Sequence, residues 1–161
     1  MTNVNNNVTV SNIYRQENSG VNSGTFLNGK WLTRQLNKIE GDAPVKLNTT
    51  KSTFTLQPGF YIINCNFPAF DVGVHQARLF NITANKTAKY GNASLSSGEN
   101  QSFSSIQYYT GNLTTPTKFK IEHQCKTMKI NNGFGVSSGF SSNETSSSFE
   151  VYGEIQIIKL S

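Results

Sequence analysis

The chain has 161 residues, of which 35% are hydrophobic and 14% charged, and its formal net charge is +5. This length suits one domain with a hydrophobic core of its own. The positive charge is mild and no arginine cluster accompanies the spread lysines, so we expect no nucleic-acid partner. The closest lysine group, Lys118, Lys120, Lys126 and Lys129, is typical of a solvated strand face, with an anionic partner as the alternative.

The composition favours strands over helices. Aromatic and β-branched residues are plentiful, and no stretch keeps the apolar period of a helix for three turns. No run approaches the roughly 20 apolar residues of a membrane-spanning helix, so we expect no membrane insertion. The stretch MTNVNNNVTVSNIYRQENSG lacks the basic start and apolar core of a signal peptide, so we expect a soluble chain or export without a cleaved signal.

The N-terminal segment differs in composition from the rest of the chain. Residues 1–24 are polar and low in complexity, with Ile13 and Tyr14 as the large side chains, which predicts a flexible or stalk-like segment. Residues 25–161 form the predicted head domain. We expect Trp31, at the start of its first strand, in the core or an interface.

Several stretches alternate with the two-residue period of a strand. In GFYIINCNFPAF (59–70) every second side chain is apolar. In KFKIEHQCK (118–126) Phe119, Ile121, His123 and Cys125 point one way, and the lysines, Glu122 and Gln124 point the other. The stretches HQARLFNIT (75–83) and SFSSIQYYT (102–110) are also typical of strands. The residues predicted to face the core are Tyr61, Ile63, Cys65, Phe67, Phe119, Ile121, His123 and Cys125.

The last predicted strand is SFEVYGEIQIIKL (148–160). Its alternation places Phe149, Val151, Gly153, Ile155 and Ile157 on one side. Residues 131–148 precede it and predict a surface loop or a frayed hairpin. Short strands with irregular loops predict an all-β jelly-roll sandwich of about 8–10 antiparallel strands.

One of the two histidines, His123, lies two residues from one of the two cysteines, Cys125. A nucleophile needs a base and an orienting group, and a zinc site needs about four ligands at recognisable spacing. His75 and Cys65 bring no such motif. We therefore expect a buried structural histidine, no catalytic residue, no metal and no cofactor, so that the protein is not an enzyme. Both cysteines as buried thiols and a disulfide between them remain open.

A series of fragments runs along residues 30–160: WLTRQLN, LQPGFYIINCNFPAFDVGVHQARLFNIT, YGNAS, QSFSSI, IEHQCK, NNGFG and FEVYGEIQIIK. Their order resembles viral fibre head domains. These jelly-roll modules, similar to the complement/tumour-necrosis-factor superfamily, cap fibre or collagen-like proteins of phages and large DNA viruses. The resemblance implies a homotrimer packed around a threefold axis and attachment to a host surface. Unlike many such heads, this sequence has no collagen repeat or coiled coil before the head.

The predicted strands also carry apolar residues on their second face, namely Phe60, Ile62, Ile158 and Leu160. Either a second sheet or a subunit must cover such a face. We favour a subunit, and these four residues are the predicted trimer interface.

The expected function is that of a non-enzymatic trimeric head of a virion fibre or spike that binds a host-surface receptor or glycan at the virion surface. The alternatives are a structural minor capsid or decoration protein contacting other virion proteins, and a secreted lectin-like adhesion module. Tyr108, Tyr109, Phe134 and Phe140 are the candidate ligand-binding residues, on loops distal to the N-terminal segment. The alternative for each aromatic is packing within the domain.

Overall fold

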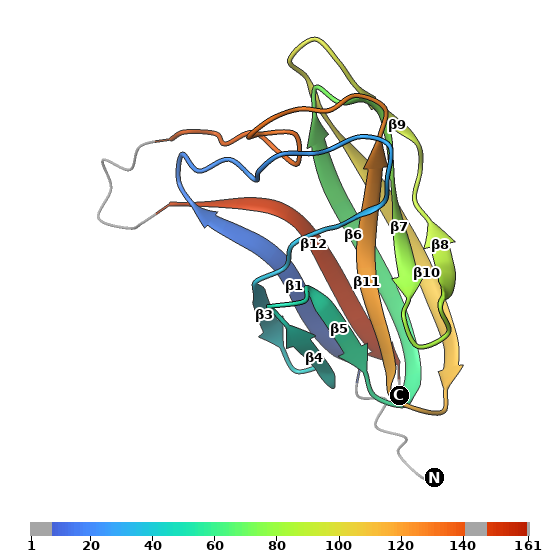
Figure 1. The fold of residues 1–161 in the computed structure, drawn as a ribbon. Helices are drawn as coiled ribbons and strands as arrows, with labels where there is room; N and C mark the ends of the chain where they lie inside the picture. The colour runs from blue at the N-terminus through green and yellow to red at the C-terminus, as the bar shows by residue number, and fades with distance from the viewer. Residues whose placement is uncertain (1–7, 141–147, 161) are drawn as a thin grey trace, which may run out of the picture.

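The computed structural model describes residues 8–140 and 148–160. Two antiparallel sheets pack face to face as a sandwich, and no residue in these ranges is helical (Figure 1). The predicted all-β sandwich is therefore confirmed. No helix in the described part of the chain could span a membrane.

Sheet A has five strands in the order β10-β6-β12-β1-β3. Their bounds are β1 (Thr9–Asn18), β3 (Lys38–Gly41), β6 (Gly59–Phe70), β10 (Gln101–Leu113) and β12 (Phe149–Leu160). The first strand, β1, pairs with the last strand, β12, on one side and with β3 on the other. The two ends of the described chain therefore lie side by side in this sheet.

Sheet B has seven strands, with the order β4-β5-β11-β7-β8 and with β2 paired to β11 and β9 paired to β7. Their bounds are β2 (Leu32–Thr33), β4 (Val45–Asn48), β5 (Thr53–Leu56), β7 (Gly73–Asn81), β8 (Lys86–Tyr90), β9 (Ser94–Ser96) and β11 (Thr117–Cys125).

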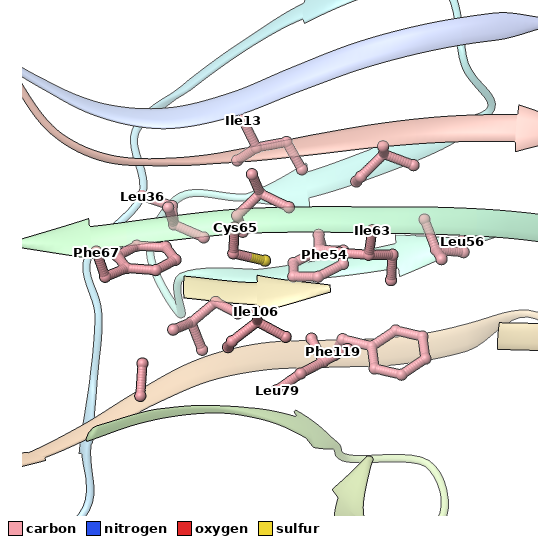
Figure 2. Close-up of a cluster of buried hydrophobic side chains, with 14 of the residues drawn as sticks. Ile13, Leu36, Phe54, Leu56, Ile63, Cys65, Phe67, Leu79, Ile106 and Phe119 are labelled. Atoms are coloured by element: carbon pink, nitrogen blue, oxygen red, sulfur yellow. The ribbon is translucent and has the colours of Figure 1, made fainter. Parts of the chain in front are cut away.

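The core lies between the two sheets, and Figure 2 shows side chains from both of them meeting there. All eight residues predicted to face inward from β6 and β11 are buried. They can be placed from sequence because strict alternation puts every second side chain on the core face. The main cluster comprises Ile13, Leu36, Phe54, Leu56, Tyr61, Ile63, Cys65, Phe67, Ala77, Leu79, Ile106, Phe119, Ile121, Ile155 and Ile157.

The structure corrects the prediction for the N-terminal segment. Residues 9–18 form β1, which pairs with β12 along its length, and Ile13 is fully buried in the core. Residues 19–24 then follow the 131–140 loop, where the backbone N–H groups of Ser23 and Gly24 donate hydrogen bonds to carbonyls of that loop. The described part of the segment is thus not a flexible or stalk-like tail, and residues 1–7 lie outside the described residues.

The structure also corrects the predicted face of β12. Ile155 and Ile157 are buried as expected, but Phe149 and Val151 are exposed. The register against β1 shifts between Tyr14 and Gln16, which marks a bulge on β12. An extra residue at a bulge reverses the inward and outward positions, so simple alternation fails beyond that point.

The predicted loop at 131–148 is confirmed for residues 131–140, and residues 141–147 lie outside the described residues. The loop packs onto the sandwich. The backbone N–H of Phe70 donates to the Gly133 carbonyl at 3.0 Å, and the Val136 N–H donates to the Gln101 side chain at 3.1 Å.

Candidate functional site

The outer face of sheet A carries an apolar patch, which we define as Val10, Phe60, Ile62, Tyr109, Ile158 and Leu160. It contains all four residues predicted for the trimer interface. Strand register places Tyr109, Ile62, Ile158 and Val10 in one row across four strands, with the pair Phe60 and Leu160 directly beside it.

The patch is accessible within the single chain. Tyr109 is 56% exposed and Phe60 38% exposed, while Ile62, Ile158 and Leu160 are half-buried by their neighbours. The rings of Phe60 and Tyr109 stack with centroids 6.5 Å apart. An ordinary solvated sheet face would carry polar residues at these positions. The patch is therefore a surface that a partner can cover.

A polar row borders the patch on the same face. Gln107, Asn64, Gln156 and Asn12 follow one another across the same four strands, and the Asn64 side-chain amide donates to the Gln156 side chain at 3.3 Å. Side-chain amides can both donate and accept hydrogen bonds. The row can therefore pair with identical amides on another copy of the chain.

The two predicted ligand-binding tyrosines lie away from the distal loops. Register places Tyr109 level with Val10, near the beginning of β1. Tyr108 points the opposite way and packs against the core. The expected position of this tyrosine pair on a distal loop is therefore wrong, because both residues lie within β10.

The two predicted ligand-binding phenylalanines differ in their surroundings. Phe134 stacks on Phe26 with centroids 4.2 Å apart, and the Arg34 guanidinium lies 4.4 Å from the Phe134 ring. Phe140 is 76% exposed at the edge of the described loop. Ligand contact by either residue stays a prediction, and Phe140 has the accessible ring.

A polar cluster crosses the interior at one end of the sandwich. His75 on β7 and His123 on β11 lie with Nδ1 of the first 2.9 Å from Nε2 of the second. The other nitrogen of His75 lies 2.7 Å from the Ser102 hydroxyl on β10. The expected burial of His123 is confirmed, since its side chain is inaccessible. Its partner His75 is equally enclosed.

A fully buried arginine organises the same region. Arg34 donates hydrogen bonds to the carbonyl oxygens of Pro68 at 3.1 Å, Phe134 at 3.0 Å and Tyr152 at 3.0 Å. These carbonyls belong to β6, the 131–140 loop and β12. One guanidinium thus ties three segments together, and among residues 8–140 and 148–160 it has no carboxylate partner. Burial lowers its pKa to about 9.

The Ser102–His75–His123 arrangement does not provide an activated nucleophile. Burial, and then the charge of Arg34, lower the pKa of His75 to about 4, so the ring is a weak base at neutral pH. The third member is a histidine whose pKa is lowered well below its usual value by burial, Arg34 and His75. It cannot stabilise a neighbouring imidazolium as a carboxylate does. The cluster therefore acts as a polar element of the core.

The two cysteines are the remaining candidate nucleophiles. Cys65 and Cys125 are both free thiols, so the buried-thiol alternative holds, and burial raises the pKa of Cys125 to about 11. A thiol in that state is a poor nucleophile. The described residues contain no group of three or more His, Cys, Asp or Glu side chains placed to hold a metal ion.

The sandwich has the jelly-roll fold of the complement C1q and tumour-necrosis-factor domains. The globular domain of a zebrafish complement 1qA protein aligns with a TM-score of 0.58 at 15% sequence identity, over 92% of this chain and 94% of that chain. Murine APRIL at pH 8.0 aligns with a TM-score of 0.51 at 10% identity, over 96% of this chain and 100% of that chain.

A second structure of murine APRIL, at pH 5.0, gives a TM-score of 0.56 at 9% identity over 96% of this chain and 100% of that chain. At these identities the likeness establishes the fold alone, and it confirms the predicted jelly roll of the complement/tumour-necrosis-factor type. No protein-family model matches the sequence, and no curated protein is significantly similar to it.

The sequence did not reveal the hydrogen bonds of Arg34 or the surroundings of Trp31. Arg34 lies in WLTRQLN without any acidic partner to mark it, and its three carbonyl acceptors are backbone atoms. Trp31 lies in neither core cluster. It is half-buried beside β2 and contacts Arg78 on the outer face of sheet B, so it does not lie in the core. Its alternative place in an interface stays a prediction.

Proposed function

We propose that this chain is a non-enzymatic, homotrimeric head of a virion fibre or spike that binds a receptor or glycan on a host surface. Domains with the C1q/tumour-necrosis-factor-like fold typically form homotrimers and bind receptors, which supports the trimer and the binding role. The fragments that resemble viral fibre heads support the attachment role and a place on the virion surface.

The single observation that carries the proposal is the apolar patch on the outer face of sheet A. Three copies arranged around a threefold axis would cover the patch of each subunit. Burying the remaining exposed part of each large apolar side chain contributes on the order of 1 kcal/mol. Burial of six such side chains in each subunit would offset part of the entropic cost of association.

Closed symmetry also suits the polar row. A position of Asn64 and Gln156 close to a threefold axis would bring their side chains near the same residues of the other two subunits. Their amides then find partners in place of water. The assembly would leave sheet B and the 131–140 loop on its outside, where ligand contact is possible.

The attachment role is tested by labelling the protein and measuring its binding to a glycan array and to intact host cells. Saturable binding to glycans or cells is expected. Binding only to proteins of a viral particle would replace the attachment role with that of a decoration protein. Glycan binding by a monomeric protein would support the secreted lectin-like module instead.

A further inference from the structure

The outer face of sheet B carries a rigid aromatic and cationic ridge. The Arg78 guanidinium carbon lies 4.2 Å from the centre of the Trp31 ring, and the Tyr90 ring centre lies 6.1 Å from it. Arg78 also donates to Glu122, with its Nε 2.8 Å from the carboxylate. The salt bridge fixes the guanidinium, and the guanidinium in turn fixes the indole. Trp31 is thus held in place on the surface of the sheet.

A shallow hollow of about 300 Å³ opens beside this indole. Gln76 on β7 and Gln124 on β11 are register partners that line it from neighbouring strands. Val74, which is 49% exposed, and Lys126 complete its far side. The hollow therefore combines an aromatic wall, an aliphatic wall, two amides and one ammonium group.

The polar groups of the hollow are only partly used within the chain. The Gln76 amide nitrogen donates to the Gly91 carbonyl at 2.8 Å, which holds this side chain in place and leaves its oxygen as an acceptor. Among the described residues, the Gln124 side chain makes no hydrogen bond and Lys126 makes no salt bridge. A ligand can therefore satisfy them without breaking existing bonds.

We infer that this hollow binds an acidic monosaccharide residue of a glycan. The C–H face of a sugar ring packs on an aromatic side chain, and adjacent hydroxyl groups pair with amides that both donate and accept. The carboxylate of the sugar pairs with the Lys126 ammonium group. A volume near the lower end of the range for small-molecule sites suits one sugar residue rather than a long segment of a chain.

The charge around the hollow favours the same ligand. On this face Arg78 and Lys120 share the carboxylate of Glu122, so in the described part of the chain the cations of that network outnumber its acid. Lys126 adds a further positive charge on the rim. An anionic sugar is therefore attracted to the site, whereas a cationic ligand is repelled.

This inference rests on the proposed binding role, and it names the ligand class and the face that binds it. The hollow lies on sheet B, away from the apolar patch of sheet A. A trimer formed through that patch would keep all three hollows open, and a multivalent glycan could occupy more than one of them. The affinity of a single hollow does not depend on the trimer.

Trp31 is the one tryptophan of the chain, so its fluorescence reports directly on the hollow. The test titrates the purified protein with methyl glucuronide and with neutral methyl glucoside. It follows Trp31 emission and, in parallel, saturation-transfer NMR signals of the sugar. We expect saturable binding of the glucuronide at least about fivefold tighter than that of the glucoside. Equal affinity for the two sugars, or no saturable binding of either by both methods, would overturn the assignment.

Two variants and a control locate the binding. Gln124→Ala should weaken glucuronide binding about tenfold, because it removes hydrogen bonds to the sugar. Lys126→Ala should remove the preference for the glucuronide and leave glucoside binding unchanged. The exposed Lys51, outside the hollow, provides the control Lys51→Ala, which should bind like the parent chain. Wild-type binding by Gln124→Ala would overturn the assignment. The molecular mass of each protein in solution is measured as well. Loss of the trimer then appears in the mass, and loss of the sugar site appears in the binding titration.

Discussion

The ring nitrogens Nδ1 of His75 and Nε2 of His123 lie 2.9 Å apart in the interior between the two sheets. They come from adjacent strands, β7 and β11, and burial, followed by the charge of Arg34, lowers the pKa of both rings. Two imidazoles this close to a buried guanidinium are stable together only while they are uncharged. The fold therefore depends on the protonation state of this pair.

Acid should destabilise the protein through the histidine pair. His75 titrates at about 4 in the folded protein and near 6.5 when unfolded. Between these values the unfolded state binds more protons, so the free energy of unfolding decreases as the pH falls. Lowering the pH from 7 to 5 should cost about 1–2 kcal/mol through His75 alone. Urea unfolding at a series of pH values measures this change.

The matched variant for the acid effect is His75→Gln, which removes the titrating group and retains a polar side chain. It should be less stable than the parent at pH 7, and its stability should depend less on pH between 7 and 5. An identical pH dependence in parent and variant would show that other groups control the acid response.

Replacing Arg34 should destabilise the fold more than replacing the partly buried Arg15. Arg34→Lys loses the fork that reaches three carbonyls in separate segments, and buried acceptors remain unpaired. We expect a loss of about 3 kcal/mol or more in the free energy of unfolding. Arg15→Lys is the control, because the Arg15 side chain is 24% exposed and pairs with Glu17, so its replacement should cost less than about 1 kcal/mol. Equal losses in the two variants, measured by urea unfolding, would contradict the role of Arg34.

Gly153 should tolerate no side chain. Its φ of +103° belongs to the region that favours glycine, and an added Cβ would overlap the Phe67 ring in the core. Gly153→Ala should therefore cost about 3 kcal/mol or more. The control is Gly98→Ala, where φ is +63° but the added Cβ meets nothing within 4 Å, so the backbone cost of about 1 kcal/mol acts alone. Thermal unfolding of both variants separates the cost of overlap with the Phe67 ring from the cost of backbone strain. Similar losses of stability in the two variants would argue against the overlap.

A charge in the apolar patch should separate the subunits before it unfolds them. Ile62→Asp places a carboxylate among Tyr109, Ile158 and Phe60, where a covered interface would have to desolvate it. We expect a folded chain of monomeric mass. Lys89→Asp introduces the same group on β8 of sheet B and should leave the mass unchanged. The concentration at which the assembly dissociates is measured by dilution. If Ile62→Asp dissociates at the same concentration as the parent, the patch is not the interface.

Strict alternation made much of this fold predictable. The faces of β6 and β11 could be assigned because their inward positions hold large apolar side chains, and the second apolar face of β6 was visible in Phe60 and Ile62. The strand β1 could not be recognised in the same way. Ile13 is the large apolar residue among its buried positions, and most of its pairing comes from backbone hydrogen bonds to β12, which leave no pattern in the sequence.

Long-range contacts account for the rest of the differences. His75 and His123 are 48 positions apart, so their hydrogen bond depends on the pairing of β7 with β11. The position of Trp31 is set by Arg78 on another strand. The exchange of inward and outward positions within β12 follows from a bulge that includes Gly153. None of these contacts is encoded by spacing along the chain.

The mass of the protein in solution, measured by light scattering on a sizing column, tests the central claim most directly. A trimer through the apolar patch predicts about 53 kDa, three times the 17.8 kDa of the chain. A mass of 17.8 kDa at micromolar concentration would contradict the proposed trimeric head and would mean that the patch of sheet A is open to solvent.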